Sequence, residues 1–444
     1  MSEFDWGLYP EAEAYLRTLV DSVLSRSETA RRLAEEIEAG TSTDFFEWVD
    51  HLALPAAKLD KAKLLALHFE ERERNGFRVF GIAGSTFFPL LAARDEELVL
   101  GPESLRDFCS VHFPALNIND AESAYQKVRL AEENGIVISA VGRRGSGGFA
   151  AHAPDDGDAY KRTLDAFRGR GRSFGTAPEG FGQLNGVIRE AKLRLSSVRV
   201  ADALFRAERE FWESKNSAAR TQKARQDALG LGWGNADHLT FRSSRANFTS
   251  LVQTLRGLGM RSRERYHAGA QAGWGAQIME HPESGEVVFA DVDLGEEERD
   301  TDFSRRPLPE RERLGTVGLW VALHGDSIFE AGLHHMAARF RFDGVREELE
   351  RRHVPMMKPF SNFPFLKQAF TTGENWMPQA ERVEALASRK LIDQTQRDKF
   401  LSDGAIGSHL ENIERRQGFK GFNQDSVSVI IRATDPRQAA AKGA

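Results

Sequence analysis

The chain has 444 residues, 41% of them hydrophobic and 28% charged, and a net charge of -6. The chain is longer than one hydrophobic core ordinarily serves, which indicates two to four packed units. Its negative net charge argues against a general affinity for nucleic acid. No run of roughly twenty apolar residues occurs, and the N-terminus has no signal-peptide pattern. We therefore expect a cytoplasmic protein with no membrane partner.

The N-terminal part predicts helices and then two rounds of the same order of elements. Residues 10–39 carry apolar side chains at helical spacing. A strand, a helix, a turn and further strands are expected next, and this order returns from residue 115. The expected strands lie at 48–54, 77–91, 116–118 and 136–141, and the expected helices lie at 58–74 and 124–131.

Two features of this part could carry chemistry, and the structural interpretation is favoured for both. His51 opens the first strand, but Pro55 rather than an arginine stands four residues later. The glycine-rich stretch 142–148 could bind phosphate through backbone N–H groups. Because no Gly-Lys-Ser/Thr ending follows it, a flexible loop is favoured.

Residues 152–235 predict a connection between two halves of the chain. A long polar helix is expected over 200–229, and its buried stripe would consist of Leu204, Phe205, Glu208, Phe211 and Trp212. Basic residues alternate with acidic residues along this segment. That pattern is typical of a solvated helical face rather than of a nucleic-acid patch.

The second half begins with a histidine motif that occurs twice. His238 is followed four residues later by Arg242, and the same spacing relates His335 to Arg339. In an extended strand, His238, Thr240 and Arg242 share one face because successive side chains alternate. Each motif leads into an amphipathic helical run. The sequence therefore contains an internal repeat that places an imidazole and a guanidinium on one face.

The pattern of a strand, a helix and several strands occurs about four times, near residues 50, 116, 238 and 335. After His238, a helix is expected at 248–258 and strands are expected at 260–266, 274–279 and 286–294. The chain has a single cysteine, Cys109. This excludes an intramolecular disulfide and a thiolate zinc cluster, so any metal must bind His, Asp or Glu.

Four units in two pairs resemble the vicinal-oxygen-chelate superfamily, whose paired βαβββ units curl into open-sided barrels around a metal. The second half is similar to 4-hydroxyphenylpyruvate dioxygenase and to the 2-oxoadipate dioxygenase/decarboxylase group. The likeness rests on the order of short motifs at 237–238, 332–335, 352–355, 410–415 and 418–423. It implies an α+β fold of paired βαβββ units, with added N-terminal and linker helices.

The resemblance implies that His238, His335 and Glu411 hold Fe(II) or another divalent metal. Their spacing along the chain suits ligands that come from separate strands. Independently of the family, two imidazoles and one carboxylate form the facial set that binds Fe(II) and leaves positions open for substrate and O₂.

Neighbouring residues leave the ligand set open. His334 could replace His335, because the two are adjacent at the start of the same strand. On the last strand, alternation does not distinguish Glu411 from Glu414, and His409 shares a face with Glu411.

The resemblance also implies contacts with a small carboxylate substrate. The two motif arginines could each bind a carboxylate bidentately. The C-terminal residues among the candidates occupy the place of the family's helix that closes the cavity, and the glutamine lies on a strand expected to face the metal. The expected contact residues are Arg242, Arg339, Gln277, Phe419, Phe422 and Asn423.

The implied function is that of a non-haem Fe(II)-dependent dioxygenase that uses O₂ to decarboxylate and hydroxylate a 2-oxo acid or related small carboxylate. One alternative is a metal-dependent isomerase or lyase of the same fold, with Glu286 or Asp291 as its base and no O₂ chemistry. A second alternative is a binding protein that has lost catalysis. A third is a phosphate-dependent enzyme that acts through residues 142–148.

The predicted organisation assigns each segment a role. The first half lacks the ligand residues at the matching positions, so we expect it to serve as a scaffold and to form the contacts of a homodimer. The segments are N-terminal helices at 1–45, a degenerate half at 46–200, a connecting helix at 201–235, the metal-binding half at 236–437 and a tail at 438–444.

Overall fold

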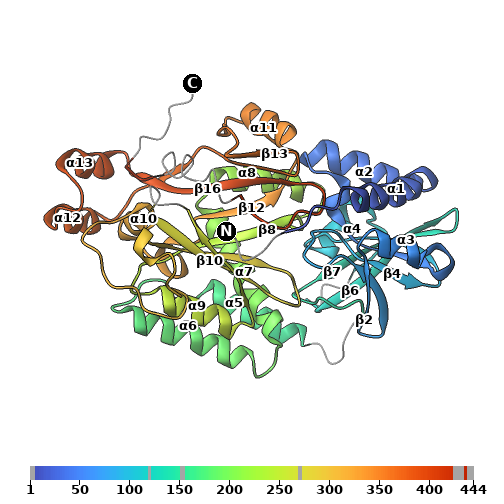
Figure 1. Cartoon of the computed structure of the whole chain (residues 1–444), viewed down its shortest axis with the longest axis horizontal. Helices are drawn as coiled ribbons and strands as arrows, with labels where there is room; N and C mark the ends of the chain where they lie inside the picture. Colours follow the sequence, from blue (N-terminus) through green and yellow to red (C-terminus); the bar gives the residue numbers. More distant parts are fainter. Residues whose placement is uncertain (1–5, 119–121, 151–155, 269–272, 424–434, 438–444) are drawn as a thin grey trace.

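The computed structural model describes residues 6–118, 122–150, 156–268, 273–423 and 435–437. The predicted tail lies outside the described residues. Two mixed β-sheets, one from each half of the chain, lie side by side with helices packed around them (Figure 1). The sheets curl into open-sided barrels of paired βαβββ units, which confirms the predicted α+β fold. Among the described helices, none is long and apolar enough to cross a membrane.

The first sheet has seven strands, in the spatial order β2-β3-β4-β1-β5-β7-β6. Strand β1 lies at its centre, parallel to β4 and antiparallel to β5. The strands are β1 (Val49–Pro55), β2 (Glu70–Arg74), β3 (Phe77–Gly81), β4 (Leu90–Ala93), β5 (Glu96–Leu100), β6 (Tyr125–Glu133) and β7 (Ile136–Arg143).

The second sheet repeats this arrangement, in the order β13-β14-β16-β12-β8-β11-β10-β9, with β15 paired to β16. Strand β8 takes the place of β1, since it is parallel to β11 and antiparallel to β12. The strands are β8 (Ala236–Arg242), β9 (Arg261–His267), β10 (Trp274–Glu280), β11 (Val287–Asp293), β12 (His335–Arg339), β13 (Ser361–Phe363), β14 (Leu366–Phe370), β15 (Glu374–Trp376) and β16 (Ala405–Arg415).

The helices lie outside the two sheets. α1 and α2 confirm the predicted N-terminal helices. The helices are α1 (Pro10–Arg26), α2 (Glu28–Thr41), α3 (Lys61–Ala66), α4 (Leu105–His112), α5 (Gly157–Arg168), α6 (Ala177–Ala191), α7 (Ser197–Ser214), α8 (Ser217–Asp227), α9 (Phe248–Gly257), α10 (Thr316–His324), α11 (Phe342–Arg351), α12 (Ala380–Ser388) and α13 (Gln394–Ser402), with short helical turns η1 (Phe45–Trp48), η2 (Ala56–Lys58), η3 (Glu296–Glu298) and η4 (Ser327–Ala331).

Of the two predicted helices of the first half, the one at 58–74 is confirmed only over α3 (Lys61–Ala66), and the one at 124–131 is wrong. The segments 70–74 and 125–133 are strands, and each forms a hairpin with the strand that follows. The hairpins turn at Asn75-Gly76 and Asn134-Gly135, where all four residues have positive φ. Such Asn-Gly pairs match the twist of a two-residue hairpin, so the turn overrides the helical spacing of the apolar residues. The second unit consequently begins at β5 and not near residue 116.

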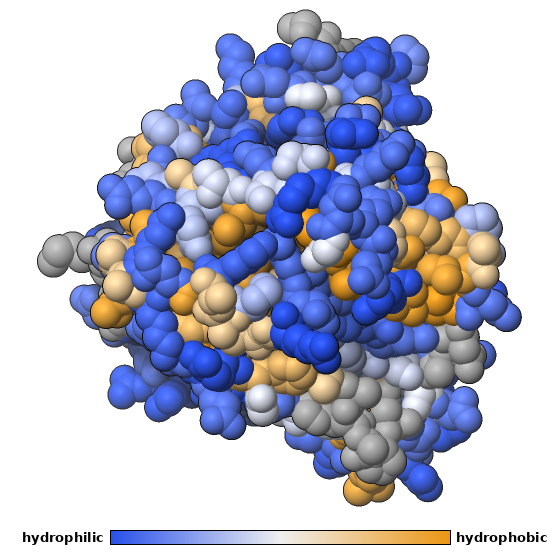
Figure 2. All heavy atoms as spheres, turned by 90° about the vertical axis from the view of Figure 1, so that its right-hand side faces the viewer, coloured by the Kyte–Doolittle hydropathy of each residue, from blue (hydrophilic) through white to orange (hydrophobic). Residues whose placement is uncertain are grey.

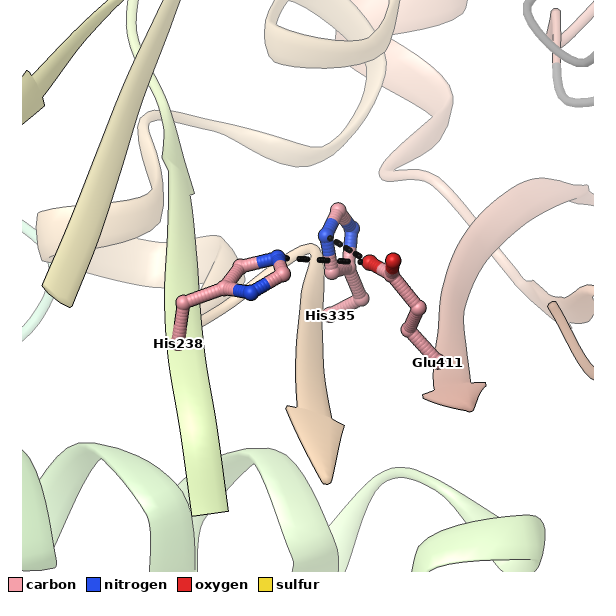
Figure 3. A group of neighbouring side chains, drawn as sticks. All are labelled: His238, His335 and Glu411. Atoms are coloured by element: carbon pink, nitrogen blue, oxygen red, sulfur yellow. Dashed lines mark ion pairs between the residues drawn. The ribbon is translucent and has the colours of Figure 1, made fainter. Parts of the chain in front are cut away.

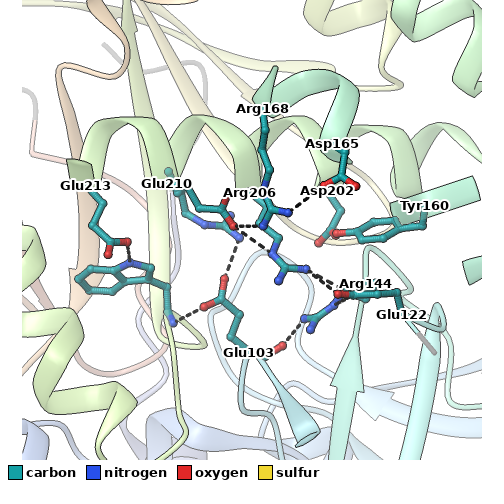
Figure 4. Close-up of polar contacts among 12 residues, drawn as sticks. Glu103, Glu122, Arg144, Tyr160, Asp165, Arg168, Asp202, Arg206, Glu210 and Glu213 are labelled. Atoms are coloured by element: carbon teal, nitrogen blue, oxygen red, sulfur yellow. Dashed lines mark hydrogen bonds and ion pairs between the residues drawn. The ribbon is translucent and has the colours of Figure 1, made fainter. Parts of the chain in front are cut away.

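Helix α7 joins the connecting segment to the first half through partly buried ion pairs (Figure 4). Arg206 contacts Glu122 at 3.2 Å, and Arg144 contacts the same carboxylate at 2.7 Å. Arg209 contacts Glu103 at 3.2 Å. The helix expected over 200–229 is therefore two helices, α7 and α8, and several of its basic residues are paired inside the protein rather than solvated.

The core of the second half lies between its sheet and α9. The predicted apolar face of this helix is fully buried and consists of Phe248, Leu251, Val252, Leu255 and Leu258. On the side of the first half, polar side chains dominate the surface and apolar side chains form smaller groups between them (Figure 2). The homodimer contact stays a prediction.

Candidate metal centre

Three ionisable side chains converge inside the second sheet (Figure 3). His238 comes from β8, His335 from β12 and Glu411 from β16, which are neighbouring strands. The Nε2 atoms of His238 and His335 lie 3.3 and 3.1 Å from Oε2 of Glu411. One nitrogen or oxygen atom of each residue lies within 4.8 Å of the others, and all three residues are buried.

The register of the sheet explains this convergence. His238 pairs with Ala337 on β12, and Ala337 pairs with Glu411 on β16. His335 lies two residues before Ala337 and therefore projects from the same face of the sheet. The small side chain of Ala337 lies between His238 and Glu411 in the row, so the larger side chains meet above it.

The charges of the three groups are strongly coupled. Burial disfavours the ionised carboxyl of Glu411, but the His238 imidazole lowers the pKa of Glu411 to about 2. Burial lowers the pKa of His238, yet Glu411 and Asp237 outweigh it and raise that pKa to about 8. Burial lowers the pKa of His335. Without a metal, the carboxylate is thus balanced mainly by the His238 imidazolium.

The donor set fits a divalent transition metal. Asp237 accepts a hydrogen bond from Nδ1 of His238 at 3.1 Å, which leaves Nε2 of that ring to face Glu411. Metal-binding histidines commonly donate their second nitrogen to a carboxylate in this way. The Thr240 hydroxyl lies 2.8 Å from Nε2 of His335. Two imidazole nitrogens and one carboxylate suit Fe(II), and related divalent ions can also use them.

The rival ligands have other partners. His334 directs Nδ1 to the carbonyl of Gly407 at 3.2 Å, and His409 directs Nδ1 to the carbonyl of Thr371 at 3.0 Å. The Glu414 carboxylate accepts the N–H of Phe342. Among the described residues, the group whose ligand atoms lie close enough to share one ion contains His335 and Glu411 and not these neighbours, so the geometry favours His335 and Glu411 as ligands.

A cavity opens beside the three residues, which form part of its lining. Arg242, four residues after His238 on β8, lines it, and Asp291 lies across from Arg242 on the paired strand β11. Within the described residues, the Nε and Nη1 atoms of Arg242 and the Oδ1 atom of Asp291 have no hydrogen-bond partner. Buried polar atoms without partners are costly, so this end of the cavity is suited to a polar group of a ligand.

Burial shifts both of these groups toward their neutral forms. It lowers the pKa of Arg242 to about 10 and raises the pKa of Asp291 to about 7, although each group opposes the shift of the other. The two side chains are 4.0 Å apart at their closest charged atoms, which is longer than a direct hydrogen bond. Arg242 therefore keeps its charge at neutral pH with two donor atoms available to a ligand.

Aromatic rings form the walls of the cavity. Phe422 lies edge-on to His238 at 5.1 Å and to Phe289 at 4.7 Å between ring centres. Such rings exclude water and strengthen electrostatic interactions within the cavity. The other aromatic residues of the wall are Tyr266, Trp274, Phe360 and Phe370.

Of the expected substrate contacts, the structure places Arg242, Phe422 and Asn423 at the cavity and the other three elsewhere. The prediction that Arg339 faces the cavity is wrong. The register shift lies on β8, where Ala337 pairs with His238 and Ala338 pairs with Ala236, so Asp237 is the extra residue. The Arg339 guanidinium contacts Asp237 at 3.0 Å and Glu47 at 3.1 Å and does not line the cavity.

Gln277 and Phe419 also lie outside the cavity. The Gln277 amide donates to the backbone carbonyls of Glu264 and Ile278 within the sheet, at 3.0 and 2.9 Å. Phe419 packs against Phe365 at 4.8 Å between ring centres. Neither side chain lines the cavity, so neither is placed to contact a substrate bound there.

Sequence reasoning missed a residue that touches the centre. Gln368 on β14 lines the cavity and donates to Oε1 of Glu411 at 2.9 Å. It leaves Oε2 of the same carboxylate to face the two imidazoles. Neither its position after a short loop nor its residue type signals this role, since the contact depends on the pairing of β14 with β16.

Two other sequence candidates have structural partners. In the glycine-rich loop, the backbone carbonyls of Ser146 and Gly148 accept hydrogen bonds from the Arg143 guanidinium. Since a phosphate site needs backbone N–H groups that point at the ligand, these inward-facing carbonyls do not favour one. Glu286 contacts Arg209 at 3.5 Å and does not line the cavity, which leaves Asp291 as the acidic alternative there.

No family model and no curated protein matches the sequence. Among solved structures, a mutant of 4-hydroxymandelate synthase from Streptomyces coelicolor is 10% identical, with 86% of this chain and 96% of that chain covered and a TM-score of 0.28. Methylmalonyl-CoA epimerase from Mycobacterium tuberculosis is 12% identical, with 41% and 88% covered and a TM-score of 0.24. The YdcJ protein from Shigella flexneri, which includes domain DUF1338, is 11% identical, with 58% and 73% covered and a TM-score of 0.26.

Proposed function

We propose that this chain is an Fe(II)-dependent dioxygenase of the vicinal-oxygen-chelate superfamily that acts on a 2-oxo acid. The observation that carries the proposal is the convergence of His238, His335 and Glu411 beside a cavity that also contains Arg242. The three residues would hold the metal, and the arginine would hold a carboxylate. When bound, Fe(II) supplies the redox chemistry with O₂ that no side chain of the cavity can supply.

The protein's own contribution is to bind, orient and shield the substrate. Arg242 offers a carboxylate two donor atoms that are unpaired in the described part of the chain, and charge-assisted hydrogen bonds of this kind fix both position and orientation. The aromatic walls keep water away from the reacting atoms. In the net reaction the 2-oxo acid loses CO₂, one oxygen atom of O₂ enters the new carboxylate and the other hydroxylates the same molecule.

Oxygen consumption tests this proposal. The Fe(II)-loaded protein is placed in an oxygen electrode with a panel of aromatic, aliphatic and dicarboxylic 2-oxo acids, and CO₂ is measured in parallel. We expect equimolar O₂ consumption and CO₂ release with at least one class, and neither with the Glu411→Ala variant. If the metal-loaded protein consumes no O₂ with any member, the dioxygenase proposal is contradicted.

Arg242 gives the substrate half of the proposal its own test. The Arg242→Met variant keeps the apolar stem and removes the charge, so we expect KM for the active 2-oxo acid to rise by roughly tenfold to a hundredfold, with metal content unchanged. Steady-state kinetics at saturating Fe(II) measure the effect. An unchanged KM would mean that the substrate carboxylate binds elsewhere.

A metal-dependent isomerase or lyase is the second candidate, because Asp291 lies in the cavity with its pKa raised to about 7. A carboxylate that titrates near neutral pH can take up and return a proton. Its proximity to Arg242 makes an ion-pair partner the simpler role. Exchange of substrate protons with D₂O in the absence of O₂ would favour this candidate over the dioxygenase.

A further inference from the structure

Asp237 is the centre of a buried charge network behind His238. Its Oδ1 atom contacts Nδ1 of His238 at 3.1 Å, and its Oδ2 atom contacts Nε of Arg339 at 3.0 Å. Arg415 donates two hydrogen bonds to the same carboxylate, at 2.8 and 3.0 Å. The side chains of Asp237 and Arg415 are only 4% and 3% exposed. The network therefore fixes which nitrogen of His238 faces Glu411.

The network reaches the first half of the chain through one residue. Oε2 of Glu47 contacts Nη1 of Arg339 at 3.1 Å, and their side chains are 17% and 26% exposed. Glu47 lies in η1, directly before β1. Asp237 alone cannot balance two guanidinium groups, and the Glu47 carboxylate supplies the second negative charge.

A comparison with the equivalent aspartate of the first half, Asp50, shows what is particular to the contact between Arg339 and Asp237. There, Asp50 contacts His51 and is gripped by Arg143 at 2.6 and 2.9 Å, as Asp237 is gripped by Arg415. Gly101 occupies the position of Arg339 in the first half. The Gly101 N–H donates to the carbonyl of Trp48, three residues before His51, and the Arg339 N–H donates to the carbonyl of Asn235, three residues before His238. Among the described residues, a second arginine therefore contacts the aspartate only in the half with the three convergent ligands.

The residue that corresponds to Glu47 also differs between the two halves. Glu47 lies four residues before His51, and the residue four before His238 is Gly234. A Cβ atom on Gly234 would lie 2.7 Å from the carbonyl of Gly101, so that contact has room for no side chain. The two halves thus approach each other through reciprocal contacts, one made of two glycines and one made of an ion pair that leads to His238.

We propose that Glu47 is a positioning residue for the metal centre of the second half. It holds Arg339 against Asp237, and Asp237 orients His238. The inference rests on the proposed function, because it assigns His238 to a metal. It gives the first half a role beyond that of a scaffold, since one of its carboxylates tunes how tightly the other half binds its ion.

A matched pair separates this role from simple adhesion between the halves. Asp44 of the first half contacts Arg416 of the second at 2.8 Å, with side-chain exposures of 15% and 29% that resemble those of Glu47 and Arg339. Neither Asp44 nor Arg416 contacts Asp237 in the structure's described part. Asp44 also contacts Arg17 at 2.9 Å and accepts the N–H of Phe46 at 3.0 Å, which caps η1. An Asp44→Asn variant removes the negative charge from the interface, while its amide oxygen can still cap η1 and the residues that contact Asp237 are unchanged.

The test measures Co(II) affinity and metal-free thermal stability of the full chain. We expect Arg339→Met to weaken Co(II) binding on the order of tenfold, as for other partners of metal-bound histidines. Glu47→Gln should weaken it several-fold, Glu47→Asp should restore part of the loss, and Asp44→Asn should leave it unchanged while lowering the Tm as much as Glu47→Gln does. The Co(II) absorption bands should shift only in the first three variants.

Two results would overturn the inference, and they differ in meaning. If Glu47→Gln and Asp44→Asn bind Co(II) as tightly as the wild type and with its spectrum, Glu47 serves only adhesion and the proposed metal centre stands. If the wild-type chain itself binds no Co(II), the proposed centre fails and this inference fails with it.

Discussion

The two halves of this chain orient a histidine in the same way but surround it with different neighbours. Across the first sheet, His51 pairs with Val99, which pairs with Ser139. The equivalent row of the second sheet is His238, Ala337 and Glu411. The first half therefore has the histidine that we expected it to lack, but a serine takes the position of the carboxylate ligand.

The second ligand differs as well. Glu97 occupies the position of His335, since it precedes Val99 by two residues as His335 precedes Ala337. Its carboxylate accepts hydrogen bonds from Ser139 at 2.6 Å and from Lys127 at 2.8 Å. A lysine ammonium thus balances the charge in the first half. The comparison teaches that an oriented histidine is part of the scaffold, whereas a metal centre needs the whole convergent set.

Removal of a ligand should have the largest effect and should break the equivalence of the two histidines. In His238→Ala and Glu411→Ala, we expect metal affinity to fall by more than about 100-fold, because a direct ligand matters more than its outer partners. His51→Ala should keep full metal content. Elemental analysis of the purified variants measures this, and equal losses in His51→Ala and His238→Ala would refute the distinction.

The ends of the central strands give a second contrast, in pH dependence. Arg242 and Asp291 are paired in the second half, whereas Pro55 and Ala93 occupy these positions in the first. Because burial raises the folded-state pKa of Asp291 to about 7, the folded protein holds this proton more tightly than the unfolded chain does. Its contribution to stability is complete below about pH 4 and is lost as the pH rises through about 7.

The Asp291→Asn variant removes this titration. In metal-free protein, the free energy of unfolding of the wild type should therefore fall relative to that of the variant as the pH rises from 4 to 7, by at most roughly 4 kcal/mol. Denaturant unfolding at several pH values measures the difference. A constant difference across this range would show that Asp291 has an ordinary pKa.

The two aspartates behind the histidines should differ in a third way. Asp50→Asn and Asp237→Asn each leave a gripping arginine without its anion, so both should destabilise the fold by about 3 kcal/mol or more. Only Asp237→Asn should weaken metal binding, by roughly 10- to 100-fold. Titration with Co(II) distinguishes them, and a matching loss of affinity in Asp50→Asn would mean that the effect is global.

The smallest effect is expected at Lys127. Its side chain is 34% exposed, and half-exposed ion pairs contribute about 1 kcal/mol or less. Lys127→Met should therefore change thermal stability little and leave metal content unaltered. If this variant gained a second metal, the lysine would be masking a competent site in the first half.

The second half could be predicted from the sequence because its signals are local. The strand that opens at His238 and the helix and strands that follow lie where the patterns predict them. The hairpins at 70–81 and 125–143 were missed because apolar spacing suggested helices, although their Asn-Gly turns carried the opposite signal.

The site shows the same division between local and distant information. Alternation along β8 places Arg242 at the cavity, but alternation along β12 does not place Arg339 there, because its guanidinium binds Glu47 and Asp237, the extra residue of β8. The contact of Gln368 with Glu411 and that of Glu47 with Arg339 join residues far apart in the chain. No spacing rule within one segment reports such contacts, so only the folded structure reveals them.

Anomalous X-ray diffraction at the iron edge, from crystals of the Fe(II)-loaded chain grown without oxygen, tests the central claim most directly. The account predicts a single strong anomalous peak at coordination distance from Nε2 of His238, Nε2 of His335 and the carboxylate of Glu411. No peak there, or a peak beside His51 and Glu97 instead, would contradict it.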